Sequence, residues 1–317
     1  APVQGMALDS QGFALPPYDL VVNEDPVQFE RPLSEQGKLY LEKVLKTWFQ
    51  EFISLNPNQV FIINTDNPSP FEISTPVMSP TNQSSYIFAG INERFALNLA
   101  GGMFLEGLAP VYVGPAAHMP INAEDWKMIS LGEQNVLVVA RSSGSALSYW
   151  GPGHLVYEDI ELFKNPWSQV LQPAHAQDLM LVLENYYHDY PKGKPTYLRM
   201  QEVYPFDLPI LLFDSKEKRK EIFDDGFYLA DSFEGQGAPV IFVVSGKTVK
   251  EAIDASQELK KAGVSYKVIN VLNLSSINNE KFVELSRGAS NIVTAIDALP
   301  QSLSSLVFDA LSDQRSI

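Results

Sequence analysis

The feature that most restricts the fold of this chain is a repeated alternation between short, almost uninterrupted apolar runs and longer helical segments. Val-Ile-Phe-Val-Val at 240–244, for example, is followed by a predicted helix at 247–262. A strand that is apolar on both faces must be buried on both faces, which is typical of a parallel sheet with helices on each side. The sequence therefore predicts an α/β fold.

The alternation occurs twice along the 317 residues, which is more chain than one core usually organises. The first series consists of a helix that begins near Ser34 and stops at Asn56-Pro57, helices at 89–104 and 174–187, and strands at 59–64, 109–113, 136–140 and 195–200. The second series consists of strands at 239–244, 264–271 and 291–296 and helices at 247–262, 278–287 and 300–311. We therefore predict an N-terminal arm at 1–33, a larger parallel-sheet domain at 34–203, a connection at 204–237 and a smaller three-layer α/β domain at 238–317.

The charge balance argues against polyanionic partners. The chain has 23 Lys and Arg against 38 Asp and Glu, a formal net charge of −15. Such a surface repels phosphate backbones and anionic lipid, so we predict binding to neither nucleic acid nor membrane. No apolar stretch approaches the roughly 18 residues of a membrane span. The first residues lack the charged and apolar regions of a signal peptide, so the predicted location is cytoplasmic.

Several familiar chemistries are excluded by what the sequence lacks. Without cysteine there is no disulfide, no thiolate nucleophile and no Cys-ligated zinc, and no Gly-x-Ser-x-Gly elbow occurs. The four histidines, at 118, 154, 175 and 188, do not have the spacing of a metal site, so no metal ligand is predicted. Ser245-Gly246-Lys247-Thr248 resembles the end of a P-loop, but Ile241 stands where that motif needs its first glycine. We predict a plain strand-to-helix turn there.

The segment around Glu93 is more informative. Glu93 lies in the first turn of the helix predicted at 89–104, where the helix dipole favours a carboxylate. Four small residues follow within the same helix and permit the close approach of another backbone: Ala96, Ala100, Gly101 and Gly102. Spacing alone favours a structural explanation, namely a charged first turn on a tightly packed helix.

A set of degenerate motifs in a specific order adds a family resemblance. The motifs are Gly90-Ile-Asn-Glu-Arg-Phe-Ala96, Gly107-Leu-Ala-Pro-Val111, Gly151-Pro-Gly-His154, Pro195-Thr-Tyr-Leu-Arg-Met200 and, further on, Val240-Ile-Phe-Val-Val-Ser-Gly246 with Gly263-Val264. Together they cover roughly residues 36–296 and resemble the transketolase family of thiamine diphosphate enzymes. The resemblance implies a pyrimidine-binding domain at 34–203 followed by a transketolase-like C-terminal domain at 238–317.

The resemblance also implies site residues. In this family a glutamate donates a proton to the aminopyrimidine of thiamine diphosphate, and Glu93 matches that glutamate. Pro115 and His118 would cover the pyrimidine. His154 matches a histidine that faces the donor substrate, with Trp150 beside it. A structural explanation of His154 is equally good, as a loop histidine that hydrogen-bonds backbone carbonyls.

Three departures from the family pattern change what is implied. The loop at 114–118 lacks the usual aromatic pair, and Trp150 replaces an acidic residue, which implies a more apolar or differently shaped ligand, or a partner surface. The Gly-Asp-Gly motif that holds the diphosphate and Mg²⁺ is absent, since Asp225-Gly226 lacks both the first glycine and the later asparagine. The resemblance therefore implies a split enzyme, a heterotetramer in which a diphosphate-binding partner subunit holds the diphosphate and Mg²⁺.

The implied function is the transfer of a two-carbon ketol or acyl unit between small carbonyl compounds, with activity only in the presence of the partner. Two alternatives remain. One is the beta subunit of a 2-oxo acid decarboxylase or dehydrogenase component, which has the same domains. The other is a non-catalytic scaffold homologue, which the altered loop at 114–118 and Trp150 favour.

Overall fold

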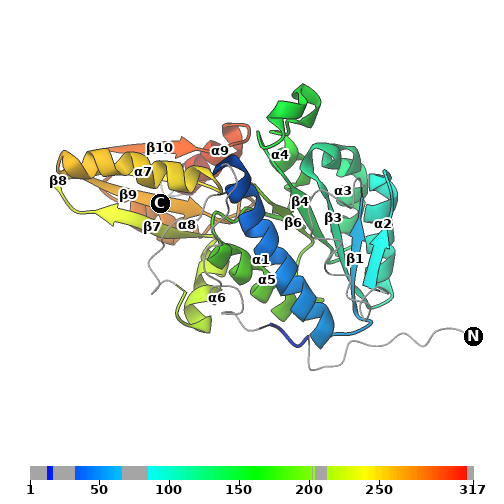
Figure 1. The fold of residues 1–317 in the computed structure, drawn as a ribbon. Helices are drawn as coiled ribbons and strands as arrows, with labels where there is room; N and C mark the ends of the chain where they lie inside the picture. The colour runs from blue at the N-terminus through cyan, green and yellow to red at the C-terminus, as the bar shows by residue number, and fades with distance from the viewer. Residues whose placement is uncertain (1–12, 17–32, 66–84, 202, 204–212, 313–317) are drawn as a thin grey trace, which may run out of the picture.

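The computed structural model of the protein describes residues 13–16, 33–65, 85–201, 203 and 213–312. Two sheets lie side by side, and helices cover both (Figure 1). The predicted α/β fold class is therefore confirmed, with a parallel first sheet and a smaller second sheet.

The first sheet has six parallel strands in the order β2-β1-β3-β4-β6-β5. They are β1 (Val60–Asn64), β2 (Tyr86–Phe88), β3 (Ala109–Pro115), β4 (Leu137–Arg141), β5 (Gln169–Leu171) and β6 (Thr196–Arg199). The central strands β3 and β4 are buried along their whole length, as their near-continuous apolar sequence requires. This order brings the carboxyl ends of β1, β3 and β4 next to one another, and ligands of open parallel sheets bind at such ends.

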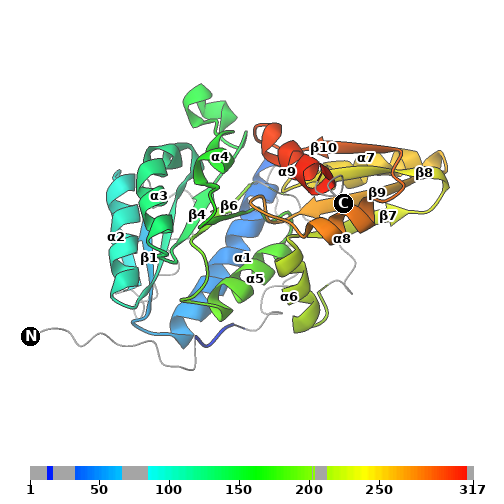
Figure 2. The ribbon, with the colours of Figure 1, turned by 180° about the vertical axis from the view of Figure 1, so that it is seen from behind.

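Helices cover both faces of this sheet (Figure 1, Figure 2). Helices α1 (Leu33–Leu55) and α5 (Ala176–His188) lie on one face, and α2 (Glu93–Leu105), α3 (Ala123–Leu131) and α4 (Asp159–Phe163) lie on the other. Successive residues of β3 point to opposite faces, so that Val111 and Val113 pack with α1 and α5 whereas Tyr112 packs with α2 and α3. Apolar side chains of α1 form a buried face, and Trp48 stacks on Tyr187 of α5 with ring centroids 5.4 Å apart.

The second sheet has four strands in the order β10-β8-β9-β7. They are β7 (Phe227–Phe233), β8 (Gln236–Val244), β9 (Val264–Val271) and β10 (Asn291–Ala295), and only β7 of these described strands runs antiparallel. Helix α7 (Thr248–Lys261) packs on one face, and α8 (Asn279–Ser286) and α9 (Gln301–Ser312) pack on the other (Figure 2). The three strand–helix units predicted for this region thus form a three-layer arrangement.

The range 204–237, predicted as a connection, contains regular structure. Residues 204–212 lie outside the described residues, but α6 (Lys216–Asp225) and β7 follow them, and β7 pairs with β9 as an edge strand of the second sheet. Residues 227–230 of β7 are apolar, but Asp231 and Ser232 follow them, so this strand is not apolar along its whole length and several of its residues are only partly buried. Of the N-terminal arm predicted at 1–33, the structure describes 13–16 and Leu33, where α1 begins.

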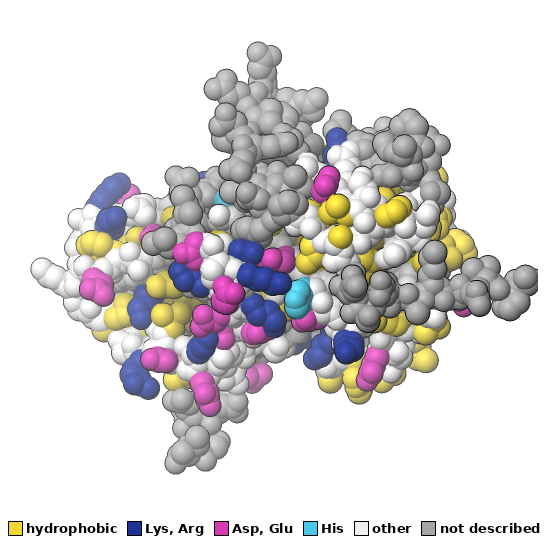
Figure 3. All heavy atoms as spheres, turned by 90° about the horizontal axis from the view of Figure 1, so that it is seen from below, with side chains coloured by type: hydrophobic (Ala, Val, Ile, Leu, Met, Phe, Trp, Pro, Cys, Tyr) yellow, Lys and Arg dark blue, Asp and Glu magenta, His cyan; other side chains and the backbone are white. Residues whose placement is uncertain are grey.

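The charged run of α6 is balanced by its neighbours. Lys218 pairs with Asp214 (3.1 Å), and Arg219 pairs with Glu184 of α5 (2.7 Å). Figure 3 shows acidic and basic side chains interspersed on the face seen from below. The exposed pair of Lys218 and Asp214 contributes little stability, whereas the pair of Arg219 and Glu184 is largely buried. Both pairs leave this run without a single-sign patch. None of the helices in the described part of the chain is long and apolar enough to cross a membrane.

Candidate functional site

The structure brings the predicted site residues together at the carboxyl end of the first sheet. They come from the first turn of α2, from the end of β3 with the 3₁₀ helix η3 (Ala116–Asn122) that follows it, and from the loop between β4 and α4. That loop, residues 142–158, contains the short 3₁₀ helices η4 (Ser148–Trp150) and η5 (Pro152–His154). The site is thus assembled from three separate stretches of sequence.

Glu93 is the first residue of α2, and only 9% of its surface is exposed. The preceding Asn92 caps the helix by accepting a hydrogen bond from the backbone N–H of Phe95 (3.3 Å). The capped turn holds the Glu93 carboxylate at the positive end of the helix, where a negative charge is stabilised.

The Oε1 atom of Glu93 is buried and receives no hydrogen bond from any residue that the structure describes. The Nδ1 atom of His118 lies 3.5 Å away, within ion-pair range. Because a buried acceptor without a donor costs free energy, such atoms in folded proteins usually meet a water, an ion or a ligand. This oxygen is therefore a candidate acceptor for a donor from outside the described chain.

The carboxyl end of β3 forms a closely packed floor beside the first turn of α2. Pro115, the last residue of β3, is buried and leads directly into η3. A Cβ atom on Gly114 would lie 2.7 Å from Thr65 Oγ1 and 2.9 Å from the Met119 methyl group, so a larger residue there would require one of these side chains to move. The Tyr112 hydroxyl lies 3.2 Å from Thr65 Oγ1, within hydrogen-bond distance.

Two buried side chains, Tyr112 in the middle of β3 and Arg141 at the end of β4, extend the site beyond the sequence prediction. Burial raises the pKa of Tyr112 well above its usual range, the hydrogen bond with Thr65 lowers this pKa, and the Glu93 carboxylate raises it again. Arg141, the last residue of β4, is aligned with Pro115 across the two strands and is buried. A polar residue at the carboxyl end of an apolar parallel strand is a sequence signal that points to Arg141, whereas the middle position of Tyr112 gives no such signal.

The rings of His118, His154 and Trp150 form a row that leads away from Glu93. The ring centroids of His118 and His154 are 6.1 Å apart, and those of His154 and Trp150 are 5.3 Å apart in an edge-to-face arrangement. Trp150 is 55% exposed, so the row ends in open aromatic surface. The predicted residues Glu93, Pro115, His118, His154 and Trp150 therefore lie in one site, and their roles stay predictions.

An exposed apolar surface borders the site. Phe88, Ile91 and Phe95 lie just before and within the first turn of α2, and they are 48%, 80% and 51% exposed. Large apolar side chains grouped on a surface often mark a place where another molecule binds. The region next to Glu93 is thus suited to contact with a second protein chain.

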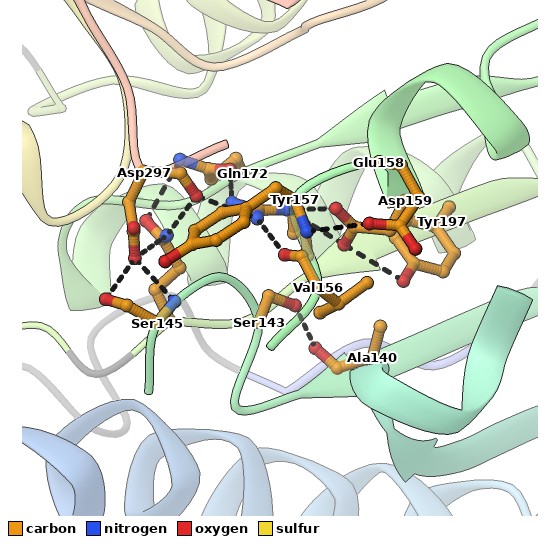
Figure 4. A network of polar contacts seen from close by, with 12 residues as sticks. Ala140, Ser143, Ser145, Val156, Tyr157, Glu158, Asp159, Gln172, Tyr197 and Asp297 are labelled. Atoms are coloured by element: carbon orange, nitrogen blue, oxygen red, sulfur yellow. Dashed lines mark hydrogen bonds and ion pairs between the residues drawn. The ribbon is translucent and has the colours of Figure 1, made fainter. Parts of the chain in front are cut away.

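The base of the 142–158 loop rests on a buried polar network (Figure 4). Arg199, at the end of β6, donates to both carboxylate oxygens of Asp159 (3.1 and 2.9 Å) and to Gln172 Oε1 (2.7 Å). The side chains of Arg199 and Asp159 are fully buried, and a buried ion pair needs further hydrogen bonds to offset its lost hydration. Gln172 provides one for the guanidinium, and the Tyr197 hydroxyl provides one for the carboxylate (3.2 Å).

Comparison with known proteins gives the family context. No protein-family model matches this chain. A 1-deoxy-D-xylulose-5-phosphate synthase of Parasynechococcus marenigrum is 28% identical over 241 residues, which are 73% of this chain and 34% of that protein. A putative transketolase C-terminal section of Methanocaldococcus jannaschii is 25% identical over 200 residues, which are 61% of this chain and 58% of that protein. The chain is thus similar in sequence to transketolase-like proteins.

The transketolase-like chain thus spans about a third of the first relative and somewhat over half of the second. A solved structure described as a split gene transketolase, inactive beta4 tetramer, superposes with a TM-score of 0.67 over 87% of this chain and 84% of that chain. The sequence identity of that pair is 20%, so the likeness shows a shared fold. The family resemblance found in the sequence is confirmed.

Proposed function

We propose that this transketolase-like chain is one subunit of a split enzyme that uses thiamine diphosphate to transfer a two-carbon ketol or acyl unit between small carbonyl compounds. The observation that carries the proposal is the buried Oε1 atom of Glu93, which has no donor among the described residues. This oxygen lies at the carboxyl end of a parallel sheet, where ligands of such sheets bind, and beside His118. A carboxylate enclosed in this way is placed to share a proton with a ring nitrogen.

The described residues fit the aminopyrimidine end of thiamine diphosphate. Glu93 would hold a proton at N1′ of that ring, and Pro115 and His118 would bound the ring on the side of η3. When bound, thiamine diphosphate supplies a nucleophilic carbon that attacks a substrate carbonyl. The part of the chain that the structure describes contains no group of three or more His, Asp or Glu side chains suited to a metal ion.

We assign the diphosphate and Mg²⁺ to a partner subunit, because the Gly-Asp-Gly motif that holds them in the family does not occur in this sequence. The partner would cover the apolar surface formed by Phe88, Ile91 and Phe95, which adjoins Glu93. Two relatives support a two-chain arrangement through their own descriptions, one as a C-terminal section and one as the product of a split gene. The proposed assembly is a heterotetramer with two copies of each subunit.

His154 and Trp150 would face the carbonyl substrate. The imidazole of His154 would hydrogen-bond a hydroxyl or carbonyl oxygen and move a proton to or from it. The centroid of its ring lies 6.1 Å from that of His118 and 5.3 Å from that of Trp150. The half-exposed indole of Trp150 would exclude water from the reacting groups once substrate or partner covers it.

The test is reconstitution with a candidate partner that carries a diphosphate-binding domain, in the presence of thiamine diphosphate and Mg²⁺. Two-carbon transfer to an aldehyde acceptor is measured for the wild type, Glu93→Gln and the control Glu106→Gln. Glu106 is an exposed glutamate at the opposite end of the same helix. We expect the Glu93 variant to lose about 10²–10⁴-fold in turnover, as removal of an acid–base group does, and the control to keep its turnover.

Three outcomes contradict parts of the proposal. Equal turnover of the wild type and the Glu93 variant removes the assigned role of Glu93. Decarboxylation of a 2-oxo acid without transfer to an aldehyde identifies the beta-subunit alternative. A complex that assembles without turnover, and that binds no thiamine diphosphate in calorimetry, identifies the scaffold alternative.

A further inference from the structure

The 142–158 loop of the first sheet is fastened to the second sheet at one carboxylate, that of Asp297, which follows β10. The Oδ2 atom of Asp297 accepts hydrogen bonds from the backbone N–H (3.0 Å) and from the hydroxyl (2.9 Å) of Ser145. Lys247, in the turn after β8, donates to the same hydroxyl (2.7 Å) and lies 2.8 Å from the same carboxylate oxygen. The amide of Gln201 also donates to Oδ2 (3.3 Å). One end of the loop is therefore held by a charged cluster.

The other end of the loop is held by the backbone around Asp297. The backbone N–H of Leu299 donates to the carbonyl oxygen of Tyr157 (3.1 Å). Arg199 donates to the carbonyl oxygens of both Val156 (3.4 Å) and Asp297 (2.9 Å). Figure 4 shows Ser145 joined to Asp297, with Val156 and Tyr157 in the same group of polar contacts.

At Gly144, near its N-terminal end, the 142–158 loop lies too close to Asp297 to leave room for a side chain. This glycine has a φ of +73°, and a Cβ atom on it would lie 2.4 Å from Asp297 Oδ2 and 2.7 Å from the Asp297 carbonyl oxygen. Gly144 also accepts a hydrogen bond from the backbone N–H of Val156 (3.3 Å), which joins the two ends of the loop. The two ends of the loop and Asp297 thus form one packed unit, whereas Tyr149 and Trp150 between them are mostly exposed.

The Asp297 carboxylate is stabilised in its charged form. Burial by itself raises its pKa, but the hydrogen bonds from Lys247 and Ser145 outweigh that effect, so the pKa of Asp297 lies below its usual value. Hydrogen bonds to a charged acceptor are stronger than those between neutral groups. The contacts between the loop and Asp297 therefore depend on the negative charge of the Asp297 side chain as well as on its shape.

We infer that Asp297 is a positioning residue for the substrate side of the site, because through Ser145 it holds the 142–158 loop that carries His154 and Trp150. The second sheet thereby acts on the site without supplying a group that touches substrate. The inference rests on the proposed function for the roles of His154 and Trp150, but the coupling between Asp297 and the loop is independent of it.

Hydrogen–deuterium exchange of the full chain tests this coupling directly. It is measured by mass spectrometry for the wild type, Asp297→Ala, the similarly shaped Asp297→Asn, and the control Asp225→Asn. Asp225 is a matched control, because its side chain is 14% exposed against 13% for Asp297 and it pairs with Lys281 at 2.8 Å, far from the loop. We expect peptides from 144–158 to exchange about ten- to a hundredfold faster in both Asp297 variants, as the loss of hydrogen bonds to a charged group predicts.

Peptides that contain Glu93 or Pro115 are expected to exchange at the wild-type rate in all variants. In the control Asp225→Asn, peptides from 144–158 are also expected to exchange at the wild-type rate. Unchanged exchange at 144–158 in the Asp297 variants overturns the inference. Faster exchange in every peptide also overturns it, because it shows a general loss of stability in place of a local coupling. This experiment needs neither partner nor cofactor, so its result is separate from the success of the proposed function.

In the reconstituted enzyme the same variants give a second readout. We expect Asp297→Asn to raise KM for the carbonyl substrate and to lower kcat, each by about tenfold, the size expected when such hydrogen bonds are lost. The affinity for thiamine diphosphate is expected to stay at the wild-type value, since Glu93, Pro115 and His118 do not lie on the loop. A fall in cofactor affinity as large as the change in KM would contradict a role specific to the substrate side.

Discussion

Asp178, in the first turn of α5, is a buried carboxylate at the contact between the two sheets, and its charge weakens the folded state at neutral pH. Its Oδ2 atom accepts hydrogen bonds from the backbone N–H groups of Ala174 (2.9 Å) and His175 (3.2 Å), and from Asn270 Nδ2 of β9 (3.1 Å). Burial nevertheless raises the pKa of Asp178 to about 6, because these hydrogen bonds offset only part of the lost hydration.

The size of the effect follows from that pKa. A rise of the carboxyl pKa from 3.8 to about 6 corresponds to about 3 kcal/mol. Because the folded state binds this proton more tightly than the unfolded state, the stability that Asp178 contributes is fully present at low pH. It is lost as the pH rises through the folded pKa of about 6. Asp178→Asn cannot ionise, so its free energy of unfolding minus that of the wild type is expected to increase by about 2 kcal/mol between about pH 4 and about pH 7, since part of the total of about 3 kcal/mol is already lost at pH 4.

The assay is urea denaturation at a series of pH values, followed by circular dichroism, for the wild type, Asp178→Asn and the control Asp189→Asn. Asp189 is a half-exposed carboxylate just beyond the C-terminal end of the same helix. The difference between variant and wild type isolates Asp178, since the other titrating groups are common to both proteins. A difference that stays constant with pH refutes the reasoning, because it shows that this carboxyl titrates alike in the folded and unfolded chains.

Three further predictions concern packing, a buried charge and assembly. Gly246→Ala places a Cβ atom at a φ of +62° and within 2.2 Å of two buried glutamine side chains. We expect it to cost at least about 2 kcal/mol in thermal denaturation. Gly263→Ala, with a φ of +70° and no neighbouring atom within 4 Å, is expected to cost only about 1 kcal/mol, and equal costs would remove the packing argument. Arg199→Met leaves its buried carboxylate partner unpaired and is expected to cost about 3–5 kcal/mol. Arg94→Met, which breaks an exposed ion pair, is expected to cost under about 1 kcal/mol, and denaturant titrations that rank the two the other way would contradict this. Phe95→Asp puts a charge on the apolar surface beside the site. It is expected to abolish partner binding in sedimentation while the melting temperature of the chain alone is unchanged. A variant that still assembles would place the interface elsewhere.

Local sequence was sufficient for the central elements of the fold. The strands predicted at 109–113 and 136–140 are β3 and β4, because a run that is apolar at nearly every position is stable only when both faces are covered. The short strand β5 and the edge strand β7 were not predicted, since a strand of three residues, or an apolar run interrupted by two adjacent polar residues, gives no comparable signal. These two segments become strands because they pair with neighbouring strands of their sheets, and their local sequence does not show that pairing.

Some residues of the candidate site could likewise be predicted from local sequence, and others could not. Glu93, His118 and His154 could be selected from the sequence through motifs, because each motif is a short run of neighbouring residues. Tyr112 and Arg141 were missed, since only the pairing of β3 with β4 brings the Arg141 charge close enough to lower the pKa of Tyr112.

The contact between Asp297 and Ser145 joins residues 152 positions apart. Short-range patterns of polarity determine which segments become strands and helices, and they show which residues can carry chemistry. The distance between two such residues, however, depends on how one sheet packs against the other. That packing is set by the summed fit of many side chains across the interface, and it leaves no periodic trace near either residue.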